Sequence, residues 1–249
     1  MKKILAVLLM SVMVMSLASC GKSSSGTAQA GVLVMATNAE FPPYEYHEGG
    51  DIVGIDAEIA AAIAEKMGCT LEIEDIAFDS IIAEVDSSKA DMGMAGMTVT
   101  EDRKQSVDFS VTYAVARQVV IVKEGGDIAS IDDLAGRKIG VQQGTTGDIY
   151  ASDDYGDDNV ERYSKGMEAV QALAQGKIDA VIIDNEPAKV FVSENEGLII
   201  LDEAYADEEY AIAVRKGNTE LLNAINEALD ELKKDGTIDE IVDRYISAN

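Results

Sequence analysis

The sequence predicts an α/β protein with two lobes, each built on a mostly parallel sheet that is flanked by helices. Apolar strand segments alternate with amphipathic helical segments along the chain, which is typical of parallel strands joined by crossover helices. The pattern restarts at Ile131, although the two halves share no exact repeat. A chain of 249 residues is long enough for two such units, and we therefore expect two lobes.

The first unit combines short apolar or alternating strands with helices that carry one apolar face. The expected strands are Val32–Thr37, Thr70–Ile76 and Met92–Met97, with a hairpin over 44–55. The expected helices are Asp56–Met67 and Phe78–Val85. A further helix is expected after Thr100, because threonine is a good N-cap residue and two acids follow it.

The second unit follows a β-branched strand, Val119–Val122, and repeats the alternation. Its further strands are predicted at Lys138–Val141, Asp179–Ile183 and Tyr210–Val214. Its helices are predicted at Ile131–Gly136, at Glu168–Gln175, from Asn185 onward, at Thr219–Lys234 and at Ile238–Ile246. Pro187 lies in the first turn of the helix that starts at Asn185, where a missing N–H does no harm.

The composition excludes several classes of function. The net charge is −26, which argues against a nucleic-acid partner and against docking on anionic lipid through a basic patch. His47 is the only histidine, which removes most routes to Ser–His or Cys–His catalysis and to a histidine-based zinc site. No cofactor or metal is expected.

The N-terminus is predicted to be a targeting segment rather than part of the fold. Residues 1–19 carry two lysines and an apolar run too short to span a membrane, and the following Cys20 completes a motif that resembles a bacterial lipobox. We expect cleavage before Cys20, lipidation of its thiol, a flexible tether over 20–30, and an extracytoplasmic protein anchored to the cell membrane. An ordinary signal peptide would leave Cys20 unexplained. Cys69 then has no partner for an internal disulfide and is expected to be a buried free thiol.

Arg103 is placed against local helix stability. It falls in the first turn after Thr100, where a cation does not suit the positive end of the helix dipole. A bound carboxylate would explain it, since a forked guanidinium and nearby backbone N–H groups fit such an anion. The alternative is a solvated arginine paired with Glu101, Asp102 or Asp108.

Unusual residues follow the ends of four predicted strands, where open α/β sheets bind their ligands. These stretches are Asn38–Phe41, Thr98–Arg103, Gly144–Thr146 and the single residue Asp184. Together with Phe41 and Phe78 they offer a cation, an anion, hydroxyls and aromatic rings, which suits a zwitterion. Enzyme chemistry has less support, because no nucleophile–base pair is visible.

An acidic loop at 153–159 invites a calcium-site interpretation. An EF-hand loop needs acids at alternate positions, glycine at the sixth and glutamate at the twelfth. Asp154, Gly156 and Asp158 break that spacing, and we expect a solvated loop.

The whole of residues 31–249 resembles one family. The stretches that carry the resemblance are ATNAEFPPYEY, GIDAEIAAAIAEKMG, FDSIIAEVDSSKADMGMAGMTVTEDRKQSVDFS, IGVQQGTTGD, KIDAVIIDNEPA and DELKKDGTIDEIVDRYI. They resemble the bacterial extracellular solute-binding proteins of family 3, which serve polar amino-acid ABC transporters. The resemblance implies a type II periplasmic-binding-protein-like fold and a monomer that binds a free polar L-amino acid and delivers it to a membrane permease.

The resemblance also implies a division of the chain into lobes and hinges. The first lobe would comprise residues 31–112 and 213–249, and the second lobe 118–207. Two hinge crossings would lie at 113–117 and 208–212.

Carried over position by position, the resemblance implies that Arg103 binds the ligand α-carboxylate and Asp184 the α-ammonium group. Thr98, with the Gly96 backbone, would share one of these groups, and Thr146 would add a donor from the second lobe. The full implied set of ligand-binding residues is Asn38, Phe41, Phe78, Gly96, Thr98, Arg103, Gln142, Thr146 and Asp184.

The class of the ligand side chain stays open at this point. Asn38 stands where several relatives have aspartate, which weakens any inference of a cationic side chain. Glu40 and Arg117 could face the cleft with opposite implications. The alternative functions are an amino-acid sensor, normally fused to a transmembrane segment and a signalling domain, and a dehydratase-like enzyme with Glu40 as its acid–base group.

Overall fold

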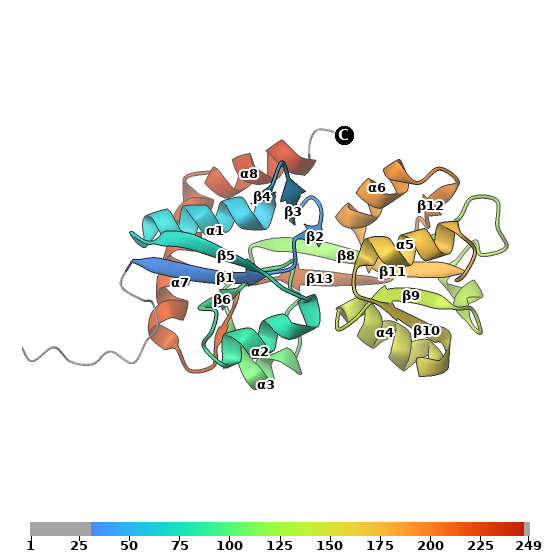
Figure 1. Ribbon diagram of the computed structural model, residues 1–249, viewed down its shortest axis with the longest axis horizontal. Coiled ribbons are helices and arrows are strands. Elements are labelled where there is room, and N and C mark those ends of the chain that lie inside the picture. Colours follow the sequence, from blue (N-terminus) through green and yellow to red (C-terminus); the bar gives the residue numbers. More distant parts are fainter. Residues whose placement is uncertain (1–30, 247–249) are drawn as a thin grey trace, which may run out of the picture.

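The computed structural model describes residues 31–246, which form two lobes side by side, each a sheet covered by helices (Figure 1). The predicted signal peptide, Cys20 and the tether lie outside the described residues. No helix within the described range is both long enough and apolar enough to cross a membrane.

The sheet of the first lobe has the strand order β5-β1-β6-β14-β7. Its strands are β1 (Val32–Thr37), β5 (Thr70–Asp75), β6 (Met92–Gly93), β7 (Val107–Phe109) and β14 (Ala213–Arg215). β1 runs parallel to β5 and β6, whereas β14 runs antiparallel to β6 and β7. The predicted mostly parallel sheet is therefore confirmed, with β14, which returns from the second lobe, as its one reversed strand.

Helices cover this sheet on both faces. They are α1 (Ile55–Lys66), α2 (Ile81–Asp86), α7 (Thr219–Lys234) and α8 (Thr237–Ile246). α1 packs against α7 and α8, and α2 packs against β1, β6 and β14. A short hairpin sheet of β2 (Glu40–Phe41), β3 (Glu45–Glu48) and β4 (Asp51–Val53) lies beside α1.

The sheet of the second lobe has the order β10-β9-β11-β8-β12. Its strands are β8 (Ala114–Lys123), β9 (Ile139–Gln142), β10 (Val160–Tyr163), β11 (Ala180–Asp184) and β12 (Leu198–Ile200). Only β8, which enters from the first lobe, runs against the others. Its helices are α4 (Thr146–Tyr155), α5 (Gly166–Ala174) and α6 (Asn185–Glu194).

Two paired strands connect the lobes. β13 (Ala206–Tyr210) pairs with β8 in antiparallel register, from Tyr210 opposite Ala114 to Ala206 opposite Gln118. Both strands run between the lobes in Figure 1. Both strands belong to the sheet of the second lobe, and residues at the carboxyl ends of β1, β9 and β11 meet between the lobes.

Some sequence predictions of secondary structure were wrong. The strand predicted at 92–97 ends at Gly93, because the chain bends and Gly96 adopts a φ of +53°, a conformation that favours glycine. The strand predicted at 210–214 is divided between β13 and β14. The acidic stretch 153–159 is not a loop, since it contains the end of α4 and a 3-10 turn, η3 (Asp157–Asn159).

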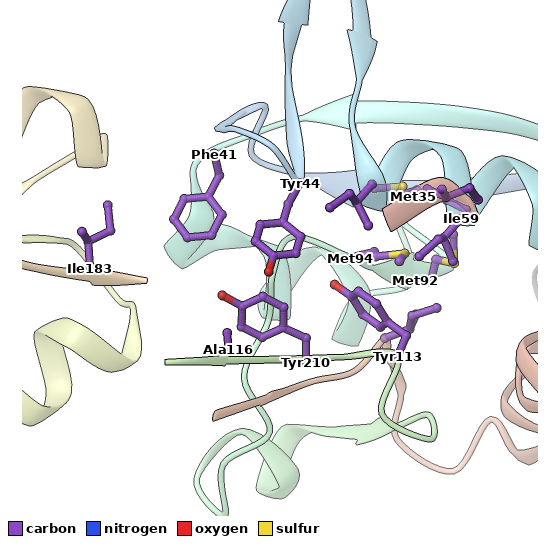
Figure 2. Close-up of a cluster of buried hydrophobic side chains, with 14 of the residues drawn as sticks. Met35, Phe41, Tyr44, Ile59, Met92, Met94, Tyr113, Ala116, Ile183 and Tyr210 are labelled. Carbon is purple, nitrogen blue, oxygen red and sulfur yellow. The ribbon is translucent and has the colours of Figure 1, made fainter. Parts of the chain in front are cut away.

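Four aromatic rings lie between the apolar core of the first lobe and the crossing strands (Figure 2). Phe41 stacks near Tyr44 at 6.1 Å between ring centroids, and Tyr44 meets Tyr210 edge-on at 5.2 Å. Tyr113, just before β8, lies 6.3 Å from Tyr210. These rings connect the core of the first lobe to the crossing strands β8 and β13.

Cys69 is a free thiol that packs against the apolar core of the first lobe. It is only partly buried, whereas a buried thiol was expected.

Candidate functional site: an interlobe pocket

A narrow pocket lies between the lobes, with about 10 Å³ of space for the centre of a water molecule. The residues that line it are Asn38, Phe41, Glu45, Phe78, Ala95, Gly96, Thr98, Arg103, Gln142, Thr145, Thr146 and Asp184. Every ligand-binding residue implied from the sequence lines this pocket, and Glu45, Ala95 and Thr145 were not expected. The topology explains the convergence, since the polar residues follow strands that end at the same interface.

Arg103 is held by neutral acceptors rather than by an ion pair. Its Nη1 donates to the Thr98 carbonyl at 2.7 Å, and its Nη2 donates across the cleft to the Gly144 carbonyl at 3.1 Å. The guanidinium carbon lies 5.4 Å from the centroid of the Phe78 ring. Burial lowers the pKa of Arg103, and the negative charges of Glu208 and Asp184 partly oppose this shift. Arginine nevertheless stays protonated in proteins.

The helix start at Arg103 is capped as predicted, although the helix itself, α3 (Arg103–Ser106), is short. The Thr100 hydroxyl accepts a hydrogen bond from the Arg103 N–H at 3.1 Å. The alternative of a solvated arginine is wrong, because the three acids proposed for it bond elsewhere. Glu101 pairs with Lys104, Asp102 accepts from Gln105, and Asp108 accepts from the Gly217 N–H.

Asp184 ends β11 and is 6% exposed. Its Oδ2 accepts from Gln118 Nε2 at 2.8 Å, and its Oδ1 accepts from the Tyr210 hydroxyl. Burial raises the pKa of Asp184 to about 8, and the nearby carboxylate of Glu208 acts in the same direction. Loss of hydration disfavours the charged form of a carboxyl group, and a neighbouring like charge adds to that effect.

Glu208 is a buried acid at this site that the sequence reasoning missed. It is 5% exposed, and its Oε2 accepts from the Thr98 hydroxyl at 2.8 Å and from Gln118 Nε2 at 3.0 Å. In the sequence it lies within a run of acids, which is typical of a solvated stretch. Only the pairing of β13 with β8 turns Glu208 inward while Asp207 and Glu209 turn outward.

A second acid pair includes one residue of the pocket lining, Glu45. Glu45 and Asp56 are almost fully buried, and Asp56 Oδ2 accepts from the Tyr113 hydroxyl at 2.7 Å. Burial raises the pKa of Asp56 to about 6 and raises that of Glu45 well above its usual range, where Asp56 adds to the shift. Glu45 Oε2 has no hydrogen-bond partner among the described residues.

One expected donor is already used inside the protein. The Gly96 N–H donates to Asp56 Oδ2 at 2.8 Å, so it is not free for a ligand as the sequence reasoning assumed. Gly96 still lines the pocket, and a side chain there would press on Phe41 and Tyr210.

Polar contacts join the two lobes around the pocket. Gln142 Nε2 donates to Asn38 Oδ1 at 2.8 Å, and Gln143 Nε2 donates to Asp79 Oδ2 at 2.7 Å. Glu40 pairs with Lys165 across the same interface, outside the pocket lining. Arg117 also lies outside it and lines a separate groove along the crossing strands.

The pocket offers charged and hydrogen-bonding groups to a polar ligand. The pocket lining contains carboxyls, amides, hydroxyls and one guanidinium, but no histidine, cysteine or lysine from the described part of the chain. Within residues 31–246, no group of three or more His, Cys, Asp or Glu side chains could hold a metal ion.

Known proteins are similar to this chain in sequence and in fold. The family model for bacterial extracellular solute-binding proteins, family 3, matches residues 33–248. The arginine-binding extracellular protein ArtP of Bacillus subtilis (strain 168) is 34% identical over 254 residues, covering 99% of both chains. The L-cystine-binding protein TcyJ of Escherichia coli (strain K12) is 30% identical, covering 89% of this chain and 85% of its own.

Solved structures agree with these relatives. An ancestral arginine-binding protein, solved with bound arginine and with bound glutamine, is 44% identical, with a TM-score of 0.82. The match covers 87% of this chain and 98% of that chain.

Proposed function

This chain belongs to family 3 of the bacterial extracellular solute-binding proteins, and from that premise we propose that its interlobe pocket binds a free L-amino acid. The α-carboxylate would lie at Arg103 and the α-ammonium group at Asp184. The observation that carries the proposal is the placement of a guanidinium, Arg103, and a carboxyl group, Asp184, in one buried pocket. An amino acid is the small ligand that carries both complementary charges on one carbon atom.

Arg103 has N–H donors that make no hydrogen bond to a backbone carbonyl of the described residues and could bind a carboxylate. A guanidinium has five N–H groups, of which Arg103 directs two to backbone carbonyls. The remaining N–H groups can bond a carboxylate, and the hydroxyl of Thr146 adds a donor from the opposite lobe. A ligand bound to both groups would hold the lobes together.

We propose a basic side chain, with arginine as the first candidate. Once the α-carboxylate and α-ammonium occupy Arg103 and Asp184, the acid left in the pocket lining is Glu45, whose Oε2 has no partner among the described residues. A guanidinium beside Phe41 and Phe78 would also stack on aromatic faces. The names of ArtP and of the similar arginine-bound structure support this choice.

Glutamine is the second candidate, because the Asn38–Gln142 amide pair offers a neutral polar lining. Calorimetric titration with L-arginine, L-lysine, L-glutamine and L-glutamate separates the two. A basic preference should give L-arginine at least tenfold tighter binding than L-glutamine, which corresponds to about 1.4 kcal/mol. Tighter binding of L-glutamine would overturn the side-chain assignment, and binding of none of the four would overturn the proposed function.

The bound amino acid would be delivered to the permease of an ABC transporter, without chemical change. Incubation of the protein with the bound amino acid should give no new product by mass spectrometry, whereas turnover would favour the dehydratase-like alternative. We propose a monomer whose lobes, 31–112 with 213–249 and 118–207, close about hinges at 113–117 and 208–212.

We also propose that the protein is anchored outside the cytoplasm through a lipid on Cys20 and the tether 20–30. The motif Leu17-Ala-Ser-Cys20 and the Ser/Gly-rich stretch behind it support this. Cys20→Ala should release the protein from membranes or leave it unprocessed, and normal maturation with unchanged membrane retention would contradict the anchor.

A further inference from the structure

We propose that Glu208 is a further determinant of ligand binding, which forms with Asp184 a two-carboxyl site that exchanges one proton for the ammonium group of the amino acid. The inference rests on the proposed function, since that function places the ammonium group at Asp184. Nothing in the sequence pattern singles out Glu208, and its part follows from the pairing of β13 with β8, which brings Glu208 to Gln118.

The geometry holds the two carboxyls together. Gln118 Nε2 bonds both Asp184 Oδ2, at 2.8 Å, and Glu208 Oε2, at 3.0 Å. Glu208 Oε2 also accepts from the Thr98 hydroxyl at 2.8 Å, and Glu208 Oε1 has no hydrogen-bond partner among the described residues. Because both carboxyls are more than nine-tenths buried, water does not screen them.

The surroundings hold too little positive charge for two carboxylates. The charged or titratable groups that face the pair are Arg103 from α3, Tyr150 from α4, Tyr210 from β13, and Tyr44 with Glu45 from the hairpin region. Arg103 is the only cation among these groups, and the ligand carboxylate is assigned to it. A second buried negative charge therefore needs a proton or the ligand ammonium as its partner.

Burial and the nearby Glu208 raise the pKa of Asp184 to about 8. Asp184 therefore holds a proton near neutral pH. An ammonium group can pair only with the ionised carboxylate. One positive charge thus enters the site as the ligand binds, and one proton leaves to the solvent.

The direct test is calorimetry of the wild-type protein near pH 7 in two buffers that differ in ionisation enthalpy. The probes are L-arginine and L-glutamine, which share the α-ammonium group and differ in side-chain charge. With L-glutamine, whose neutral side chain leaves Glu45 unchanged, we expect release of up to about one proton per ligand. L-arginine should release more, because its guanidinium would also displace the proton that burial holds on Glu45, whose pKa is raised. Equal binding enthalpies in the two buffers, meaning no net proton release, would overturn the inference.

The pH dependence gives a second test. A proton on Asp184 competes with the ligand, so affinity should fall by at most about tenfold per unit as pH drops below about 8. Glu208→Gln removes the neighbouring negative charge while keeping the shape of the side chain. Its affinity should therefore decline only at lower pH, and its proton release near pH 7 should be smaller.

Glu209→Gln is the matched control. It makes the same charge change on the next residue of β13, where the side chain accepts from the Thr112 hydroxyl rather than from the pair. Glu209→Gln should keep the wild-type pH profile. If Glu208 only positions Thr98 and Gln118, Glu208→Gln would shift affinity equally at every pH, and that parallel shift would contradict the proposal.

Asp184→Asn separates failure of this inference from failure of the proposed function. Near-wild-type binding by Asp184→Asn would mean that the ammonium group lies elsewhere, and both proposals would fall. Lost binding in Asp184→Asn together with no proton release by the wild type would overturn only the part assigned to Glu208.

Discussion

Arg103 and Asp184 lie in the same pocket, but their surroundings treat charge in different ways. Arg103 is bonded to two backbone carbonyls and lies over the Phe78 ring, and all three neighbours favour a cation. Asp184 receives two hydrogen bonds but lies beside a second carboxyl, Glu208. Under the proposed function, the Arg103 end of the pocket would be charged before the ligand arrives, whereas the Asp184 end would become charged with it.

This difference assigns separate roles to the two ends. A charged and fixed guanidinium would recognise the ligand carboxylate independently of pH in the physiological range. A buried acid pair would make recognition of the ammonium group depend on pH. Substitutions that change one end of the pocket at a time test this difference.

The largest expected effect is that of Arg103→Ala. Its removal leaves the ligand carboxylate unpaired in a buried site, which typically costs about 2–5 kcal/mol, or about thirty-fold or more in affinity. The loss should be similar at about pH 6 and about pH 8. Calorimetric titration with L-arginine measures it, with Glu231→Ala on α7, an exposed partner of Lys66, as a control that should change affinity by less than about twofold. Near-wild-type binding by folded Arg103→Ala would mean that the carboxylate lies elsewhere.

Asp184→Asn should weaken binding but stabilise the ligand-free protein. The folded-state pKa of Asp184 is raised to about 8, so the stability that this carboxyl contributes is present below its unfolded pKa and is lost as pH rises through about 8. The asparagine side chain has no proton to lose. One pKa unit corresponds to about 1.4 kcal/mol, and we expect the Asp184→Asn substitution to add more than about 1 kcal/mol at about pH 8 and little at about pH 4. Thermal unfolding at both pH values checks this, and a gain that does not grow with pH would contradict the raised pKa.

Gly144→Ala tests closure at a contact between the lobes, beside the backbone carbonyl that accepts a hydrogen bond from Arg103. An added Cβ would lie 2.8 Å from Asp79 Cβ in the opposite lobe, and overpacking of this kind costs about 1–3 kcal/mol. The control is Gly156→Ala, in the same lobe at a φ of +80° against +77°, with nothing within 4 Å of the added atom. Both variants carry the backbone strain, but only Gly144→Ala should lose affinity for L-arginine. Equal affinities for the two would mean that the lobes do not approach here when ligand binds.

The smallest effect is expected from the exposed pair that joins the lobes, Glu40 and Lys165. Because both side chains are substantially exposed, Lys165→Ala should cost about 0.2–1 kcal/mol of binding, or less than about fivefold, and less still at high salt. Lys138→Ala breaks a comparable pair with Glu161 inside the second lobe and should leave affinity unchanged. A loss above about tenfold for Lys165→Ala would place this pair in the binding site itself.

The two ends of the pocket also differ in how visible they are in the sequence. The Arg103 end could be predicted from local signals. Thr100 suits the start of a helix, and Arg103, three residues later, is a cation in the first turn, where it does not favour the helix. Asp184 was visible as an acid at the end of an apolar strand. The fold followed from alternating strands and helices, whose apolar periodicity is local as well.

The buried acids Glu208 and Glu45 could not be predicted in the same way. Each becomes buried only through pairing with a strand or helix elsewhere in the chain, and in the sequence each stands in an ordinary polar stretch. The break between β13 and β14 was missed for a related reason. The residues around the break are uniformly apolar. They are divided only because the chain leaves β13, which pairs with β8, and enters the sheet of the first lobe as β14.

A crystal structure of the protein with L-arginine tests the central claim most directly. The account predicts the α-carboxylate within about 3 Å of the Arg103 guanidinium and the α-ammonium within about 3 Å of an Asp184 oxygen, between two closed lobes. An amino acid bound in the reverse orientation, or bound outside the pocket between the lobes, would contradict it.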